Sequence, residues 1–400
     1  MTQTKKNALA FFFILSLGFA YFLKYNTKAE TSIVITSVST TSPRVGEKIK
    51  FTYQLRSDSS DFTLIALPDT QGYSEAYPEI YLSQTEWVVE NKEIRNIVFL
   101  SHLGDIVENN DLYEKEWIRA DKAMRLLDGV VPYGFLAGNH DMQEDGSANY
   151  YEEYFPASRY EENEWWGGSF FNNRNNYQFF SAGGDDYIIL HLQYCPTREV
   201  IDWANKVFAE YPERKAILST HAFINNKANR IDKCNWNSNG DVDAATIWNR
   251  LVKNTSNIFL VLSGHIEGVA RRTDIQDRYI YQLLSDYQAM ENEGNGYLRI
   301  MTFQPSADKI IVETYSPYLD QYLTDDKNKF TLEFDMRSGI PPTGKIIISN
   351  GSEECIATLP AGSCELPLRK SGENIFSAKY GGDKNHQGSI SEGFVISVED

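Results

Sequence analysis

The sequence predicts an α/β domain together with a smaller all-β domain. Between residues 62 and 314, short apolar runs alternate with helical patterns, which is typical of a sheet with buried strands. From Pro341 onward the pattern changes to short strands separated by Gly and Pro turns, without helical periodicity. The 400 residues exceed one typical domain, so a catalytic-sized domain plus a smaller module fits the length.

The N-terminal segment has the layout of an export signal. Two lysines precede an apolar run over residues 8–23, as in secretory signals. Gly18 and Ala20 fit a small-x-small cleavage pattern, whereas the apolar run approaches the roughly 17 residues that span a bilayer. We therefore expect residues 1–30 to be either a cleaved signal peptide or an uncleaved membrane anchor. Both alternatives place the remaining chain outside the cytoplasm, as a secreted, periplasmic or outwardly anchored protein.

Export makes the four cysteines candidates for disulfides, since an oxidising compartment permits them and an even count suits them. Cys355 and Cys364 flank a Leu-Pro-Ala-Gly turn signal, so we expect them to bridge adjacent strands. Cys195 and Cys234 are candidates for a second bridge, which their separation in sequence leaves open. No Cys spacing typical of bound zinc occurs.

Two strand patterns precede the α/β segment. Residues 32–38 and 48–55 alternate apolar with polar or β-branched residues around a Pro and Gly turn. The C-terminal segment alone is short of the about seven strands that a sandwich of this kind requires. We therefore predict one β domain split into residues 31–57 and 338–400, with an α/β domain of residues 58–337 inserted between its parts.

The elements of the α/β segment follow from apolar runs that end at Gly, Pro or polar residues and from 3.6-residue periodicity. In chain order they are a strand at 62–66, a helix at 81–91, a strand at 96–103, a helix at 113–127, a strand at 133–136, a surface loop at 160–176, a hairpin of strands at 177–180 and 187–192, a helix at 197–211, a strand at 216–220, a helix at 244–253 and strands at 258–263, 279–284, 297–303 and 309–314.

Polar side chains follow five of these strands at the point where each strand ends. In an open α/β sheet the carboxyl edge is where sites are built. Each residue alone has a structural alternative as a helix cap, a turn residue or a core histidine. Their occurrence on successive strand ends favours a common site. The residues are Asp69, Gln71, Asp105, Asn139, His140, His221, His265 and Glu267.

This series resembles the calcineurin-like metallophosphoesterase superfamily, whose motifs are DxH, GDxx, GNHD, a lone His and GHxH. The matching segments are 69–71, 104–107, 138–141, His221 and 264–267. The resemblance implies a four-layer α/β sandwich with two divalent metal ions. It implies that Asp105 bridges the two ions. The remaining ligands would be Asp69, Gln71 and Glu267 on one side and Asn139, His221 and His265 towards the other.

The resemblance also implies a mechanism. Two cations about 3.5 to 4 Å apart polarise phosphoryl oxygens and make a hydroxide available for in-line attack. Protonation of the leaving group is assigned to His140, which Asp141 would orient by a hydrogen bond. Gln71 and Glu267 stand where the family has histidines, so oxygen ligands should help Mn, Mg or Fe compete against Zn. The identity of the metal, Mn, Fe or Zn, stays open.

The C-terminal segment is similar to bacterial Ig-like domains with a YxGDxNxxxS pattern, here at residues 380–389. In those domains a VGxxxxFT strand comes first, and residues 45–52 supply it before the insertion. The similarity therefore supports the split-domain prediction. It also implies a contact of this module with the cell envelope.

We expect an exported, metal-dependent phosphomonoesterase or phosphodiesterase that acts on a small-molecule or surface substrate. The alternative is a cell-surface binding or adhesion protein with a vestigial metal site. Catalysis is favoured because His140 and Asp141 accompany the ligands, and binding alone would not need them. A net charge of −17 argues against a nucleic-acid duplex as partner. Aromatic residues of the 160–176 loop and residues 285–288 are candidates to approach the substrate.

Overall fold

The computed structural model describes residues 31–400 except 41, 58–59, 235–241, 337–341 and 384–385. The chain divides into two compact units: Ser59–Ser338 form the larger one, and the segments before and after it form the smaller one. The predicted signal or anchor at residues 1–30 lies outside the described residues. Among the helices of the described part, none is both long and apolar enough to cross a membrane.

The larger unit contains two mixed sheets. The strands of the first sheet, in sheet order, are β11 (Gly268–Ile275), β12 (Tyr279–Asp286), β10 (Ile258–Ser263), β9 (Lys215–Thr220), β8 (Asp185–Leu192), β7 (Asn175–Ala182) and β6 (Trp166–Phe170). The strands of the second sheet are β15 (Gln321–Leu323), β14 (Lys309–Ser316), β13 (Leu298–Gln304), β3 (Phe62–Leu67), β4 (Ile97–His102) and β5 (Tyr133–Gly134), with β16 (Phe330–Glu333) paired to β14.

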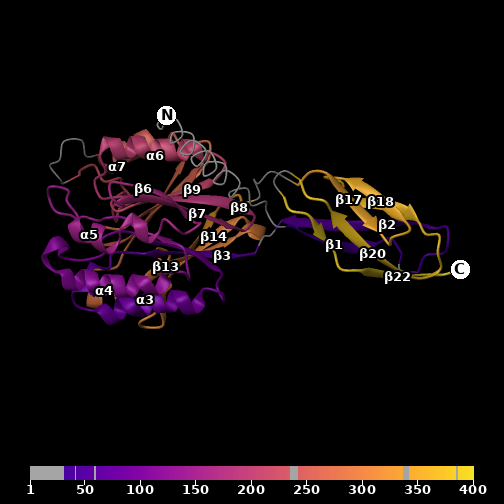
Figure 1. Cartoon of the computed structure of the whole chain (residues 1–400), viewed down its shortest axis with the longest axis horizontal. Helices are drawn as coiled ribbons and strands as arrows, with labels where there is room; N and C mark the ends of the chain where they lie inside the picture. The colour runs from indigo at the N-terminus through magenta and orange to yellow at the C-terminus, as the bar shows by residue number, and fades with distance from the viewer. Residues whose placement is uncertain (1–30, 41, 58–59, 235–241, 337–341, 384–385) are drawn as a thin grey trace, which may run out of the picture. The chain divides into compact units, whose positions relative to one another are not determined.

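Helices cover the outer faces of both sheets. Those of the described part are α2 (Gln71–Glu75), α3 (Pro78–Asn91), α4 (Glu114–Met124), α5 (Asn149–Tyr154), α6 (Arg198–Glu210), α7 (Ala244–Ile247) and α8 (Glu291–Gly294), and α7 continues into the π-turn Trp248–Val252. Short 3₁₀ turns lie at Asn110–Leu112, Arg125–Leu127, Ala157–Arg159 and Pro305–Ala307. Figure 1 shows α6 and α7 over one sheet and α3 and α4 over the other. The predicted four-layer α/β sandwich is confirmed.

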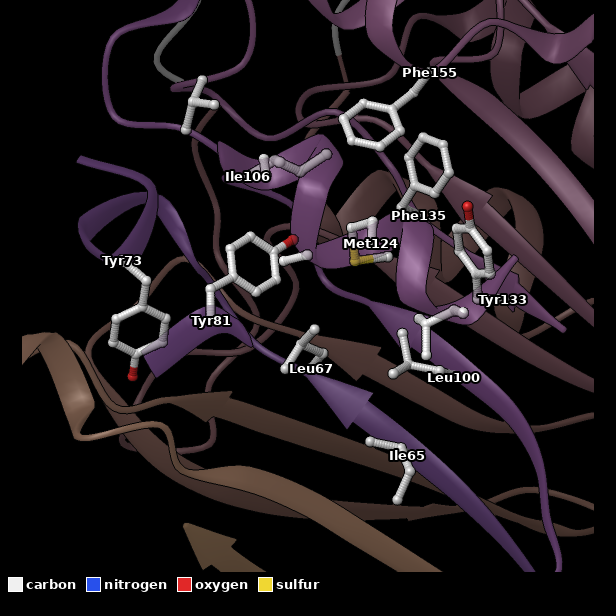
Figure 2. Packing of buried hydrophobic residues seen from close by; sticks show 14 of the residues in the cluster. Ile65, Leu67, Tyr73, Tyr81, Leu100, Ile106, Met124, Tyr133, Phe135 and Phe155 are labelled. Atoms are coloured by element: carbon white, nitrogen blue, oxygen red, sulfur yellow. The ribbon is translucent and has the colours of Figure 1, made fainter. Parts of the chain in front are cut away.

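Strand β3 shows how the alternation of side chains builds these layers. Ile65 and Leu67 belong to the apolar cluster under α3 and α4, whereas Leu64 and Ala66 belong to the cluster between the two sheets. Successive side chains of a strand point to opposite faces, so a strand buried on both faces is apolar throughout. Figure 2 shows the side chains of Leu67 and Leu100 gathered with Tyr81 of α3 on the helix-covered face.

Parallel pairing brings several strand ends to one edge of each sheet. In the second sheet β3, β4 and β5 are parallel neighbours. In the first sheet β8, β9, β10 and β12 are parallel neighbours. Because parallel strands share a direction, the residues that follow them lie along the same sheet edge. This arrangement places the candidate site.

Strands β6, β11, β15 and β16 are not among the elements that the sequence predicted. The predicted surface loop at 160–176 contains strand β6, and its Gly167 and Gly168 hid the pattern because glycine is depleted in strands. The tryptophans of this loop pack on aromatic neighbours, with Trp166 at 5.4 Å between ring centroids from Tyr160. Strand β11 was not predicted, because two arginines and an aspartate interrupt its apolar pattern.

The smaller unit is all-β, as predicted, and has two sheets. One contains β1 (Thr31–Val38), β2 (Lys48–Ser57) and β19 (Ser363–Pro367). The other contains β18 (Glu354–Thr358), β17 (Lys345–Ser349), β20 (Gly372–Tyr380) and β21 (Ser389–Ile390), with β22 (Phe394–Val398) paired to β20. Residues from before and after the larger unit thus pair in one sheet, Phe51 opposite Cys364. The Ig-like assignment of this unit stays a prediction.

Both candidate disulfides are present. Cys355 and Cys364, whose Cα atoms are 5.8 Å apart, join β18 to β19. They were expected to bridge adjacent strands, but these two strands belong to different sheets, so the bond ties the two sheets together. Cys195 and Cys234, at 5.6 Å between Cα atoms, join the segment after β8 to the segment before α7.

Candidate metal centre

The ends of β4, β9 and β10 bring one carboxylate and two imidazoles together. One ligand-type atom from each of Asp105, His221 and His265 lies within 4.8 Å of the others. The rings of the two histidines are 4.9 Å apart between centroids. Asp105 and His221 are buried and His265 is partly buried. The group therefore has the composition and spacing that a cation requires.

Asp69, which follows β3, connects the two sheets at this edge. Its Oδ1 atom accepts a hydrogen bond of 3.0 Å from the backbone N–H of His265. Its Oδ2 atom is buried and has no hydrogen-bond partner among the described residues. A Cβ atom on Gly264 would lie 2.0 Å from Asp69 Oδ2, so this position accepts only glycine. The backbone thus fixes the carboxylate and leaves one oxygen free to bind a ligand.

Asp105 is held by the GNHD segment. Its Oδ1 atom accepts a hydrogen bond of 2.8 Å from the backbone N–H of His140. Its Oδ2 atom lies 3.1 Å from His221 Nε2. A Cβ atom on Gly138 would lie 2.1 Å from Asp105 Oδ1, which explains the glycine of that motif. Asp105 is therefore fixed between the GNHD segment and His221.

His221 points one ring nitrogen at the site. Its Nδ1 atom lies 2.8 Å from the carbonyl oxygen of Leu103, an acceptor, so Nδ1 carries a proton. Its Nε2 atom lies 3.1 Å from Asn139 Oδ1 and 3.1 Å from Asp105 Oδ2. Burial lowers the pKa of His221, but the carboxylates of Asp105 and Asp69 raise it to about 10. The surrounding acceptors thus favour positive charge at this position.

The two positions that depart from the family pattern behave differently. Gln71 is buried, its Nε2 atom lies 3.3 Å from Asp105 Oδ2, and its Oε1 atom has no hydrogen-bond partner in the described part of the chain. Glu267 is exposed and lies outside the group of Asp105, His221 and His265. The structure therefore brings Gln71 to the site, whereas it does not bring the Glu267 carboxylate into this ligand group.

His140 lies beside the centre and has a carboxylate partner that the sequence reasoning missed. Its Nδ1 atom lies 2.9 Å from the Glu108 carbonyl oxygen and 3.4 Å from Glu108 Oε2. Burial lowers the pKa of His140, but Asp105 and Glu108 raise it above its ordinary value. Glu108 comes directly after the GDxx segment 104–107, three residues beyond Asp105, and that short spacing was the available signal.

Asp141 does not take the expected role of orienting the His140 ring. Its fully buried carboxylate accepts hydrogen bonds from the backbone N–H groups of Ile106, Val107 and Gly138, at 2.8 to 3.1 Å. Asp141 therefore holds the GDxx and GNHD segments together. Burial and the Asp105 charge raise its pKa to about 7.

Asp286 is a further buried carboxylate at this edge that was not among the predicted ligands. It ends β12, is 0% exposed and has one oxygen, Oδ2, without a hydrogen-bond partner among the described residues. Burial and then Asp286 are the largest causes of a raised pKa of Asp69. Its position after an apolar strand is the same signal that identified Asp69 and Asp105.

The residues present fit divalent cations. Oxygens of Asp69, Gln71 and Asp286 are buried without hydrogen-bond partners in the described part of the chain. Buried polar atoms normally have such partners, and buried charges are normally paired or bound to a metal. The donor set combines carboxylate, amide and imidazole groups, which suits Mn, Fe or Zn.

Comparisons with known proteins agree with this geometry. The model of the calcineurin-like phosphoesterase family matches residues 62–266, just over half of the chain. Uncharacterized protein YvnB of Bacillus subtilis (strain 168) is 38% identical over 296 residues, which cover 70% of this chain and 22% of that protein. The chain thus spans about a fifth, 22%, of the length of this curated relative.

Two solved structures are also similar at low sequence identity. A dimetal phosphatase from Danio rerio is 10% identical with a TM-score of 0.46, over 68% of this chain and 99% of that chain. GAP50, the anchor in the inner membrane complex of Plasmodium, is 11% identical with a TM-score of 0.39, over 70% of this chain and 92% of that chain. On the family match, the chain belongs to the calcineurin-like phosphoesterase family, a family of phosphoric ester hydrolases.

Proposed function

We propose that the protein is an exported, metal-dependent hydrolase of phosphomonoesters or phosphodiesters. One observation carries the proposal: carboxylate, amide and imidazole groups from several strand ends converge with unpartnered buried oxygens, and His140 lies beside them. A buried structural cluster would pair these oxygens with donors. A bound cation would instead satisfy them.

Two divalent cations would be held by the residues around Asp105. Asp105, Asp69 and Gln71 would hold one ion, and Asp105, His221 and His265 would hold the other. Asn139, whose Oδ1 atom lies 3.1 Å from His221 Nε2, joins the second set. When bound, such ions polarise phosphoryl oxygens and lower the pKa of water.

His140 would protonate the leaving-group oxygen. Its backbone N–H donates to Asp105, which ties the residue to the centre. Its Nδ1–H faces the carbonyl and carboxylate oxygens of Glu108, so Nε2 is the atom available to the substrate. The raised pKa keeps a proton on this ring at a higher pH than in a free histidine. Glu108 therefore acts as the positioning residue for the acid.

Export is supported by the two disulfides, because such bonds persist in oxidising compartments. The lysine-flanked apolar run of residues 8–23 supports the same proposal. We extend it to anchoring of the uncleaved form at a membrane and to contact of the smaller unit with the cell envelope. The substrate would then be a small-molecule or surface phosphoester.

Hydrolysis of aryl phosphates tests the proposal. The purified protein, loaded separately with Mn, Fe and Zn, is assayed on an aryl phosphate monoester and an aryl phosphate diester, with metal analysis of each sample. We expect bound metal and hydrolysis of at least one ester, both removed by a chelator. Absence of bound metal and of hydrolysis under all three loadings would contradict the proposal and favour a surface binding protein with a vestigial site.

A further inference from the structure

Asp286 lies at the level of the proposed ligand His265, which follows β10 of the first sheet. Strands β10 and β12 are parallel with Ser263 opposite Leu284, so two residues further along Asp286 stands at the level of His265. In the antiparallel pairing with β11, Asp286 stands opposite Gly268. The family match ends at residue 266, so Asp286 lies outside it.

The Asp286 carboxylate is buried and only half satisfied. Its Oδ1 atom accepts a hydrogen bond of 3.0 Å from the backbone N–H of Gln288. Its Oδ2 atom is buried and lacks a hydrogen-bond partner among the described residues. Asp69 shows the same division, because its Oδ1 atom is bound by the His265 N–H and its Oδ2 atom has no such partner.

The two half-satisfied carboxylates are close neighbours. Asp69 Oδ1 accepts a hydrogen bond from the backbone N–H of His265, and Asp286 stands at the level of His265 on the strand next to β10. Two buried carboxylates side by side repel each other, and leaving a buried charge unpaired is costly. A cation between their free oxygens would remove both costs. The unpartnered Gln71 Oε1 atom supplies a third oxygen at the same centre.

We propose that Asp286 is a ligand of the metal ion held by Asp69 and Gln71. The inference rests on the proposed function and adds a residue to its site. This chain has Gln71 and Glu267 where the family pattern has histidines, so the ion on this side lacks two imidazoles. Asp286 replaces part of that coordination. Carboxylate and amide oxygens favour a hard ion, so Mn²⁺ or Mg²⁺ is the expected occupant.

Glu267 is the competing residue for this role. It is exposed, and the hydrogen bond that the structure gives it uses its backbone oxygen, which accepts from Asn226 at 3.2 Å. Asp286 is 0% exposed and has a free oxygen. The buried carboxylate is therefore the better ligand of the two.

The test is a Mn²⁺ titration of the full chain and of two matched variants, Asp286→Asn and Glu267→Gln, followed by metal analysis after desalting. We expect the wild type and Glu267→Gln to retain two ions per chain. In Asp286→Asn one of the two affinities should fall by at least about tenfold. Two ions bound to Asp286→Asn with unchanged affinity would overturn the inference, as would loss of an ion from Glu267→Gln alone.

The thermal unfolding midpoint of the wild type and of Asp286→Asn, measured with chelator and with Mn²⁺, shows whether Asp286 coordinates metal or has a structural role. We expect Asp286→Asn to unfold at or above the wild-type temperature in chelator, since a buried unpaired charge is removed, and to gain less from Mn²⁺. A lower midpoint in chelator with an unchanged Mn²⁺ gain would show a structural role instead. A wild type that binds no metal would refute the proposed function itself.

The outcome does not depend on folding of the variant. If Asp286→Asn does not fold, an anomalous-scattering map of Mn²⁺-loaded wild-type crystals decides. A peak about 2.0 to 2.6 Å from Asp286 Oδ2 supports the inference. Peaks at the centre with no contact to Asp286 overturn it.

Discussion

Two aspartates on neighbouring strands of one hairpin have opposite environments. Asp274 lies near the turn between β11 and β12, and Asp286 lies at the other end of the same pair of strands. Asp274 accepts hydrogen bonds from Arg230, from Arg272 at 2.7 and 3.0 Å and from Gln282 at 2.6 Å. Asp286 accepts one from a backbone N–H and has a free buried oxygen.

The pKa values of Asp274 and Asp286 are shifted in opposite directions by these environments. Burial alone would raise the pKa of Asp274, but Arg272, Gln282 and Arg230 lower it to about 2. Burial raises the pKa of Asp286 to about 6 with help from Asp105 and Glu267, against the Gln288 N–H and His221. Asp274 has its counter-charges within the chain, whereas Asp286 belongs to a cluster in which acids outnumber bases. A cation bound from solution would balance the excess negative charge of such a cluster.

Of the changes considered, removal of metal should have the largest effect on ester hydrolysis. If the strand-end acids serve a cation, chelation should reduce ester hydrolysis to the background rate, because the bound cations would polarise the phosphoryl group and lower the pKa of water. Re-addition of Mn²⁺ should restore it. Hydrolysis that persists after metal analysis shows an empty protein would contradict the comparison.

Replacement of His140 should have the next largest effect. We expect His140→Gln to lower kcat by about 10² to 10⁴ for a substrate with a poor leaving group, which is the usual contribution of general acid catalysis. The loss should be smaller for a nitrophenyl leaving group, which needs little protonation. Metal content should not change. An equal loss for both leaving groups would show that His140 acts in another way.

Replacement of Glu108 should affect catalysis, whereas replacement of Asp141 should affect stability. We expect Glu108→Gln to lower kcat by about tenfold, since it positions the acid from outside the reacting atoms. Asp141→Asn should instead lower the free energy of unfolding by about 1 to 3 kcal/mol, because one of the buried N–H groups loses its acceptor. Kinetics and chemical denaturation measure the two effects. The reverse pattern would restore Asp141 as the orienter of His140.

Replacement of Asp274 should have the smallest effect. The folded-state pKa of Asp274, about 2, lies below the ordinary value. Its contribution to stability is therefore present above pH of about 4 and is lost as the pH falls towards 2. We expect Asp274→Asn to be less stable by about 0.5 to 1 kcal/mol at pH 7, because the cluster is partly exposed. The difference from wild type should shrink at low pH, and a constant difference would exclude an ionic origin.

The sequence predicted the layers and most of the strand ends, because strands buried on both faces are apolar throughout and stop at Gly, Pro or Asp. It did not predict β6 and β11, whose glycines and charged residues suit edge strands but hide the strand pattern. Local patterns carry little information about edge strands, since their stability depends on the neighbouring strand.

The side-chain roles at the site were less predictable than its location. The sequence placed Asp141 beside His140, but neighbours in sequence point in different directions in the GNHD segment. Asp286 needed the pairing of β10 with β12 before its nearness to Asp69 was visible. Glu267 follows the motif spacing, yet its side chain is exposed. The spacing of the motifs therefore predicted where the centre lies. Which side chains contact it depends on the three-dimensional packing.

Anomalous diffraction from crystals of the Mn²⁺-loaded wild type tests the central claim most directly. We expect two peaks about 3.5 to 4 Å apart among Asp69, Asp105, His221 and His265. An absence of peaks at this edge of the sheets, in crystals grown from protein that hydrolyses phosphoesters, would contradict a two-metal centre at the strand ends.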